Sequence, residues 1–295
     1  MKTAYIFPGQ GSQKVGMGQA HFESNADFAR LVDQANDILG IDLKSVMFEG
    51  PADKLKQTAY TQPAIFLHSV ALYRTLEAQP DMVAGHSLGE FSALTACNAI
   101  SFEQGLQAVH QRGKLMQEAG EKYEGTMAAL IGMEDEKVED ICSRAEEETG
   151  QTVIAANYNC PGQLVIAGDV DAVEKAVEIA KDEGCRLARL LPVSGAFHSP
   201  LMKPAYDGLK EVLNKLTINE PDCPLYSNYT AQPTTDASEL RENLLNQLLN
   251  PVQWSQTMVN MHKDGASEFI EVGPGKVLQG LVKRTVNGVE INGYQ

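Results

Sequence analysis

A serine set between two glycines, in Gly85-His-Ser-Leu-Gly89, is the feature that most limits the folds open to this chain. The apolar run 82–84 before it predicts a buried strand, and the small and apolar residues of 88–99 predict a helix. A G-x-S-x-G turn between a strand and a helix is typical of a nucleophile elbow, which exposes the serine oxygen at the edge of a sheet. We therefore predict an α/β fold with Ser87 as a candidate nucleophile.

The chain outside this motif divides into two patterns. A strand at 5–7 runs into the glycine-rich turn 8–13, helices are predicted at 26–38 and 63–76, and strands and helices follow one another again after 202. Between 126 and 192 the predicted order is β-α-β-β-α-β, which is typical of a ferredoxin-like unit. We predict a larger α/β-hydrolase-like domain with a parallel sheet (1–124 and 194–295), an inserted ferredoxin-like subdomain (125–193), and a ligand cleft between them.

Composition excludes several classes of protein. The 295 residues include 43% hydrophobic ones, which is ample for a packed core, and the net charge of −15 argues against a general nucleic-acid binder. No run approaches about 18 apolar residues, so we expect no membrane span, and the apolar start is too short for a signal peptide. Five cysteines without C-x-x-C spacing fit a reducing cytoplasm and no metal site. A monomer is the default expectation.

A serine nucleophile needs a base, and six histidines are available. His86 adjoins Ser87, but neighbouring side chains at a strand end point in different directions, so we expect it to pack or to form a hydrogen bond. His198 lies in loop 192–200, which leaves the predicted subdomain and can place an imidazole over the elbow. No acidic residue stands in a comparable setting, so a Ser–His dyad is simpler than a triad. Context alone does not fix the base.

Motifs spread in order over nearly the whole chain resemble the malonyl-CoA:acyl-carrier-protein transacylase family. The pentapeptide alone is shared with many lipases and esterases, whereas the combination is far more specific. The segments that carry the resemblance are PGQGSQ (8–13), TQPA (61–64), GHSLGE (85–90), RGKLMQEA (112–119), NCPGQLVIAG (159–168), GAFHSPLM (195–202), NPVQW (250–254) and EVGPGKVL (271–278).

The resemblance implies a role for the residues around the elbow. Ser87 would be the nucleophile and His198 its base. The backbone amides of Gln10 and Leu88 would form the oxyanion hole, and Gln253 would help to orient the imidazole.

The resemblance also implies a binding site for the malonyl group. Arg112 would bind the free carboxylate, because a guanidinium fork matches a carboxylate and acetyl would leave it unpaired. Gln62 and Asn159 would line the site. Phe197, directly before the base, resembles the malonyl-selective form of its loop. No cofactor is implied beyond the substrates malonyl-CoA and holo acyl carrier protein.

The implied function is ping-pong transfer of malonyl to acyl carrier protein for fatty-acid synthesis. Alternatives are the same transfer for a polyketide synthase, an acyl-thioester hydrolase that need not keep Arg112, and a carrier-binding subunit without activity. The carriers of this family are acidic, so an acidic chain should dock them through a local basic patch. The candidates are Lys203, Lys276, Lys283 and Arg284.

Overall fold

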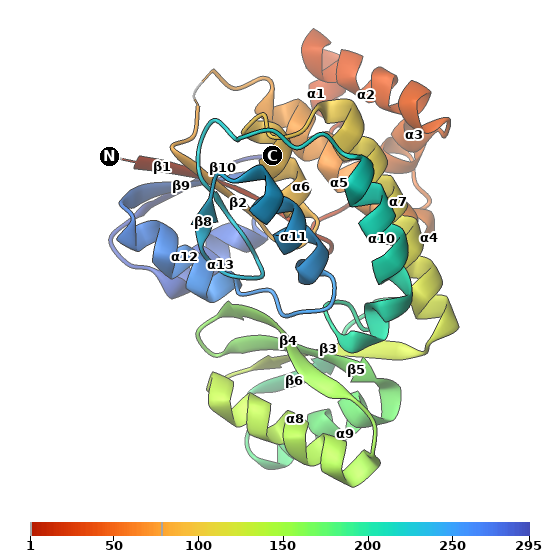
Figure 1. Ribbon diagram of the computed structural model, residues 1–295, viewed down its shortest axis with the longest axis vertical. Helices are drawn as coiled ribbons and strands as arrows, with labels where there is room; N and C mark the ends of the chain where they lie inside the picture. The colour runs from red at the N-terminus through yellow and green to blue at the C-terminus, as the bar shows by residue number, and fades with distance from the viewer. Residues whose placement is uncertain (1, 78) are drawn as a thin grey trace.

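The computed structural model describes residues 2–77 and 79–295 and contains two sheets (Figure 1). The larger sheet has the strand order β10-β9-β1-β2-β7-β8, in which β8 is an antiparallel edge strand and the others run parallel. A parallel sheet is buried on both faces, which explains the unbroken apolar runs predicted as strands. The strands are β1 (Lys2–Phe7), β2 (Met82–Gly85), β7 (Leu225–Tyr226), β8 (Pro233–Thr234), β9 (Ala266–Val272) and β10 (Glu290–Tyr294).

Helices cover both faces of this sheet (Figure 1). Tyr5 and Phe7 pack into a core shared with α5, α6 and α7, whereas Ala4 and Ile6 pack on α12 and α13. None of the described helices is both long and apolar enough to cross a membrane. The helices of this part are α1 (Gln19–Ser24), α2 (Ala26–Leu39), α3 (Leu43–Phe48), α4 (Ala52–Leu55), α5 (Thr58–Tyr73), α6 (Gly89–Ala96), α7 (Phe102–Lys122), α10 (Lys203–Lys215), α11 (Ala237–Gln247), α12 (Trp254–Lys263) and α13 (Val277–Thr285), with a short 3₁₀ turn at Pro200–Met202.

The start of α5 corrects one prediction. A helix was expected to begin near Pro63, but α5 begins at Thr58 and Pro63 lies inside it. Proline has no N–H and leaves the carbonyl four positions earlier without its helical donor. That carbonyl belongs to Ala59, and it lies 3.3 Å from Nδ1 of His110 on α7. A side chain from the neighbouring helix thus replaces the lost helical bond.

The smaller sheet has the order β4-β5-β3-β6 with antiparallel neighbours throughout. Its elements are β3 (Gly125–Ile131), α8 (Asp135–Thr149), β4 (Val153–Cys160), β5 (Gln163–Asp169), α9 (Val170–Asp182) and β6 (Leu187–Leu190). Helices α8 and α9 cover one face, and Met127, Val165 and Ala167 on the other face join the core of the larger part (Figure 1). The predicted two-part α/β class with a βαββαβ unit is confirmed, while the domain limits at 124/125 and 193/194 stay a prediction.

The loops that form the site all follow the carboxyl-terminal ends of strands in the larger sheet. The strands β1, β2, β7 and β9 run parallel, so their carboxyl ends lie together, and ligands of open α/β sheets bind at such an edge. The turn 8–13 follows β1, the Ser87 turn follows β2, Asn228 follows β7, and the turn 273–275 leads from β9 to α13.

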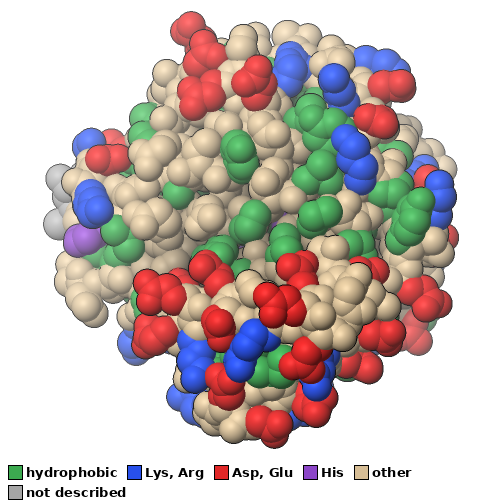
Figure 2. Space-filling model, turned by 60° about the horizontal axis from the view of Figure 1, so that its bottom comes forward, with side chains coloured by type: hydrophobic (Ala, Val, Ile, Leu, Met, Phe, Trp, Pro, Cys, Tyr) green, Lys and Arg blue, Asp and Glu red, His purple; other side chains and the backbone are tan. Residues whose placement is uncertain are grey.

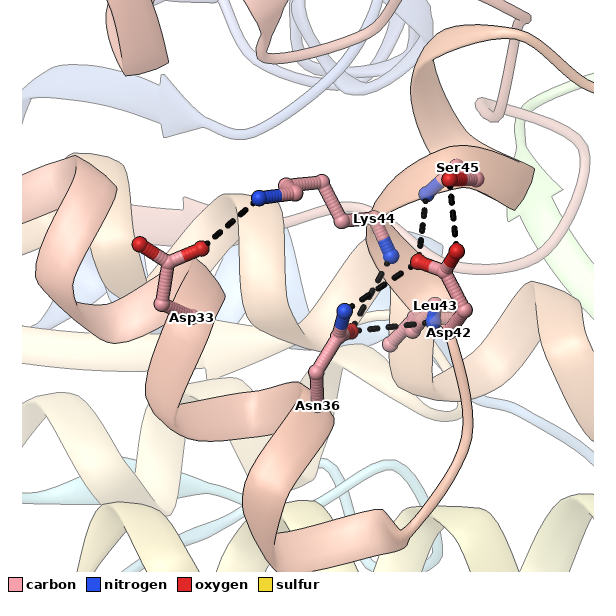
Figure 3. A network of polar contacts seen from close by, with 6 residues as sticks. All are labelled: Asp33, Asn36, Asp42, Leu43, Lys44 and Ser45. Atoms are coloured by element: carbon pink, nitrogen blue, oxygen red, sulfur yellow. Dashed lines mark hydrogen bonds and ion pairs between the residues drawn. The ribbon is translucent and has the colours of Figure 1, made fainter.

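A polar network outside the site joins α2 to α3 (Figure 3). The side-chain oxygen of Asn36 accepts hydrogen bonds from the backbone N–H groups of Leu43 and Lys44, at 2.9 and 3.1 Å. Asp42 caps α3 by accepting from the backbone N–H and the hydroxyl of Ser45, at 3.0 and 2.7 Å. These bonds satisfy N–H groups that a helix start leaves unpaired, and those from Ser45 lower the pKa of Asp42.

Candidate active site

Ser87 lies in a strained turn that close packing holds in place. Its φ is 54°, in the left-handed region that non-glycine residues seldom adopt. A Cβ atom on Gly85 would lie 1.9 Å from the carbonyl group of Gly89, and one on Gly89 would lie 2.2 Å from the carbonyl oxygen of Phe7. Both glycines of the motif are therefore required for the turn to pack on itself and on β1. This is the strand-turn-helix geometry of a nucleophile elbow.

His198 is the histidine that reaches Ser87. Its Nε2 lies 2.7 Å from Oγ of Ser87, and its Nδ1 lies 2.8 Å from the backbone carbonyl oxygen of Gln247. A carbonyl only accepts, so Nδ1 carries the proton and Nε2 is left to accept from the serine. Burial, together with the charge of nearby Arg112, lowers the pKa of His198 to about 3. The imidazole is therefore neutral at neutral pH, as a general base must be.

The prediction that Gln253 orients the imidazole is wrong. Gln253 precedes α12, and its backbone N–H donates to the carbonyl of Asn228 at 2.9 Å. Gln247 instead holds the imidazole, because it is the last residue of α11 and carbonyls in the last turn of a helix have no helical donor. The side chain of Gln247 is also fully buried and faces the elbow, where its Nε2 donates to the carbonyl of Ser87 at 3.0 Å.

Two backbone N–H groups beside the serine are open to a ligand. Within residues 2–77 and 79–295, neither the N–H of Leu88 nor that of Gln10 donates a hydrogen bond. Leu88 is the N-cap residue of α6, where the helix dipole favours negative charge. Asn228 fixes the turn, since its Oδ1 accepts from the N–H of Ser87 and its Nδ2 donates to the carbonyl of Gly85, each at 2.6 Å.

Arg112 extends from α7 to the nucleophile and is 1% exposed. Its Nη1 donates to Oε1 of Gln62 at 2.8 Å, and its Nη2 donates to Oγ of Ser87 at 3.2 Å and to Oε1 of Gln247 at 2.9 Å. Burial lowers the pKa of Arg112 to about 10, so the guanidinium keeps its charge at neutral pH. A buried cation directly beside a serine oxygen suits a substrate that carries a negative charge close to its reacting carbon.

A cavity of about 260 Å³ joins these groups. Of the residues singled out from the sequence, the cavity is lined by Gln10, Gln62, Ser87, Leu88, Arg112, Asn159, Phe197 and His198, and not by Gln253. Asn159 comes from β4 of the smaller sheet, and its Oδ1 lies 2.8 Å from Nε2 of His86. His86 thus has the hydrogen-bonding role expected of it, and both parts of the chain build the cavity.

Comparison with known proteins places this geometry in a family. The acyl transferase domain family matches residues 4–293. The malonyl CoA-acyl carrier protein transacylase of Bacillus subtilis (strain 168) is 44% identical over 286 residues, which cover 96% of this chain and 90% of that protein. The chain belongs to the malonyl-CoA:acyl-carrier-protein transacylase family. The predicted resemblance is therefore confirmed.

Solved structures of this transacylase family have the same fold. The crystal structure of an acyl carrier protein S-malonyltransferase from Vibrio cholerae O1 biovar eltor has a TM-score of 0.94 and 42% identity, covering 100% of this chain and 97% of that one. A malonyl-transacylase solved in complex with its type II polyketide synthase acyl-carrier protein has a TM-score of 0.95 and 38% identity, covering 100% of this chain and 96% of that one. An acyl carrier protein is thus a partner within the family.

The charged surface of this transacylase-family chain is uneven. Acidic side chains, with lysines and arginines among them, gather on the lower half of Figure 2, where the smaller sheet and its helices lie. Lys276, Lys283 and Arg284 are exposed at or on α13, and Val277, which follows Lys276, lines the cavity. Lys203 is exposed at the start of α10 and is not among the residues lining the cavity. The structure therefore places α13, and not α10, at the cavity.

Proposed function

We propose that this chain transfers the malonyl group of malonyl-CoA to the phosphopantetheine thiol of an acyl carrier protein through a malonyl ester of Ser87. The observation that carries the proposal is the buried guanidinium of Arg112, 3.2 Å from the nucleophilic oxygen. A malonyl thioester bears a carboxylate one carbon away from its reacting carbonyl group. One substrate can therefore present its carbonyl carbon to Ser87 and its carboxylate to Arg112.

The first half-reaction uses the Ser–His pair. The Ser87 oxygen attacks the thioester carbonyl and its proton passes to Nε2 of His198, while the N–H groups of Leu88 and Gln10 stabilise the oxyanion. When the tetrahedral intermediate collapses, the C–S bond breaks and His198 returns the proton to the leaving thiol. In the second half-reaction the carrier thiol gives its proton to His198 and attacks the ester. Malonyl-S-carrier leaves and the Ser87 hydroxyl is restored.

Arg112 also links substrate binding to the strength of the base. In the empty site its charge helps to lower the pKa of His198. A malonyl carboxylate bound to Arg112 offsets that charge, so the pKa of His198 rises and its imidazole becomes a better proton acceptor. An acetyl group brings no such charge. Selectivity for malonyl therefore includes a contribution from the base as well as from binding.

The carrier docks along α13 in this proposal. Lys276, Lys283 and Arg284 supply positive charge there, in a chain whose net charge is −15. Val277, which is 55% exposed, follows Lys276, lines the cavity and gives the phosphopantetheine arm an apolar edge to enter by. Lys203 is a weaker candidate, since its ammonium group lies over the Tyr206 ring, 4.2 Å from the centroid.

Fatty-acid synthesis is the pathway that we propose for this chain, with a polyketide carrier as the alternative. The five cysteines are free, which fits a reducing cytoplasm. A monomer suffices for the reaction, since every group used in the mechanism comes from one chain.

Intact-protein mass spectrometry tests the function directly. Wild type and Ser87→Ala are incubated briefly with malonyl-CoA, acetyl-CoA or methylmalonyl-CoA, and a holo carrier protein is then added. We expect a malonyl adduct on wild type alone that moves to the carrier. An adduct lost to water at the same rate with or without carrier would establish the hydrolase instead. Equal adducts from acetyl-CoA would refute malonyl selection.

A further inference from the structure

The mechanism leaves Glu90, on the first turn of α6, without a role. Its side chain is fully buried, and carboxylates are seldom buried unless they are paired. Its Oε2 accepts from the backbone N–H of Asn228 at 3.1 Å and from Nε2 of Gln247 at 2.8 Å. Its Oε1 makes no hydrogen bond of good geometry among the described residues, with the Ser227 hydroxyl lying near the carboxyl group. A buried acid with one free oxygen beside a reaction site calls for an explanation.

The two residues that Glu90 holds are the ones that hold the catalytic groups. Gln247 accepts from Nδ1 of His198 through its carbonyl and from Nη2 of Arg112 through its side chain. Asn228 accepts from the N–H of Ser87. The Glu90 carboxylate is therefore linked to the base, to the carboxylate-binding arginine and to the nucleophile, in each case through one intervening residue.

Glu90 also balances charge. Among the described residues, Arg112 from α7 is the charged group that faces it, while α11 contributes the amide of Gln247 and the segment after β7 contributes Ser227 and Asn228. Gln247 lies between the two charges and is hydrogen-bonded to both. In the empty site, at a pH above the pKa of Glu90, one negative and one positive charge are buried together. A malonyl carboxylate on Arg112 would add a second negative charge to this dry region, and burying an unpaired charge is costly.

We propose that Glu90 is the positioning and charge-compensating residue of this site. Its carboxylate orients Gln247 and Asn228 and balances Arg112 while the site is empty, and it takes up one proton from solvent when a malonyl carboxylate binds to Arg112. The inference rests on the proposed function, because it needs a substrate that carries a carboxylate. It makes malonyl selection depend on pH, whereas acetyl transfer has no such dependence.

The sign of the effect follows from the state of Glu90. Burial raises the pKa of Glu90 to about 7, against the bonds from Gln247 and Asn228 that lower it. Below this pH Glu90 is already neutral and malonyl binds without further protonation. Above it, binding must draw a proton from increasingly basic solvent, so malonyl affinity falls as the pH rises. The titration of His198 lies well below this range, since burial and the charge of Arg112 lower its pKa to about 3 in the empty site, and the burial remains when malonyl offsets that charge.

The test measures kcat/KM for ester formation from malonyl-CoA and acetyl-CoA between about pH 6 and about pH 9. Both thioesters carry the same CoA, so their ratio isolates the carboxylate. Uptake of one proton lowers the ratio by up to about tenfold per pH unit above the pKa of Glu90, so we expect the wild-type ratio to fall by up to about 100-fold between about pH 7 and about pH 9. Glu90→Gln keeps a carbonyl oxygen for both donors but cannot titrate, so its ratio should stay flat. Glu90→Asp should restore the fall, even at a lower rate.

Glu271 provides the matched control. It is equally buried, and burial likewise raises its pKa to about 7, but it accepts from the backbone N–H groups of Leu278 and Gln279 at the start of α13. Glu271→Gln should show the wild-type fall. The proposal would be overturned if the wild-type ratio of kcat/KM for malonyl-CoA to that for acetyl-CoA did not change with pH, or if Glu90→Gln showed the same fall as the wild type.

Calorimetry on Ser87→Ala tests proton uptake with Glu90 intact. Malonyl-CoA and acetyl-CoA are bound near pH 8 in two buffers of different ionisation enthalpy, which reveals the protons exchanged. We expect uptake that approaches one proton for malonyl-CoA and none for acetyl-CoA. Equal values for the two would overturn the charge role even if Glu90→Gln does not fold. Wild type that still moves malonyl to the carrier would show that only this inference, and not the proposed function, had failed.

Discussion

Arg112→Met separates the proposed carboxylate contact from the rest of the chemistry. Methionine fills much of the same space without a charge, and it leaves Ser87 and His198 at 2.7 Å from each other. Removing one partner of a buried, hydrogen-bonded charge pair costs about 2–5 kcal/mol. At about 3 kcal/mol, the variant should lose roughly 150-fold in kcat/KM for malonyl-CoA.

Acetyl-CoA gives the contrast. It has no carboxylate for Arg112, so its kcat/KM should change by less than about threefold. Loss of the nearby charge should even raise the pKa of His198 toward its ordinary value, which strengthens the base. The assay is the rate of adduct formation with each thioester by rapid quench and mass spectrometry. Equal losses for both thioesters would refute the carboxylate contact.

Folding must be checked in the same variant. Arg112→Met leaves the buried Oε1 atoms of Gln62 and Gln247 without their donors, at about 1–3 kcal/mol each. Urea denaturation should show this loss of stability. Arg112→Lys is the companion variant, because it keeps a point charge but not the planar fork, and it should lie between wild type and Arg112→Met in malonyl selectivity.

Three further predictions concern the edges of the site and the fold. Phe197→Ser opens the cavity beside the base, so the ratio of kcat/KM for methylmalonyl-CoA to that for malonyl-CoA should rise; an unchanged ratio would show that the ring does not exclude the branch. The double variant Lys283→Glu, Arg284→Glu should raise KM for the carrier several-fold and leave KM for malonyl-CoA nearly unchanged. Equal changes in the two KM values would argue against docking on α13. Asp42→Ala removes the cap of α3 and should lower the free energy of unfolding by about 1 kcal/mol in urea at neutral pH. The difference should shrink as acid protonates the wild-type carboxylate, since its pKa is lowered in the folded state.

The sequence predicted the elements whose residues are buried in a regular pattern. The strand 82–84, the elbow and the βαββαβ order all rest on apolar runs punctuated by glycine, and the structure has them with small shifts at their ends. β10 was missed because its residues are mostly exposed at the edge of the sheet and include a glycine. The start of α5 was misplaced because proline usually marks a first turn, and only packing reveals that His110 meets the freed carbonyl of Ala59.

Within the site, side chains were easier to predict than backbone groups. Ser87, His198 and Arg112 stand in segments that resemble a family, and the structure brings them together. Gln247 was missed because any residue supplies a carbonyl, and the one that meets the imidazole depends on where α11 ends. A signal for Asn228 existed, since it is an amide placed two positions after a buried strand of the parallel sheet.

The smaller sheet has a consequence for how the Ser–His pair forms during folding. Ser87 and His198 are 111 positions apart in the sequence. Within that segment β3 pairs with β6 at Ala128 and Leu190, so once the sheet has formed, more than half of the segment no longer counts as free loop. Each halving of a loop lowers its closure cost by about 0.6 kcal/mol. If this sheet folds first, a shorter loop has to close to bring the imidazole to the serine, and the entropy cost of that closure is lower. Substitutions far from the cavity that loosen the sheet should slow the appearance of activity on refolding, although every reacting group is intact.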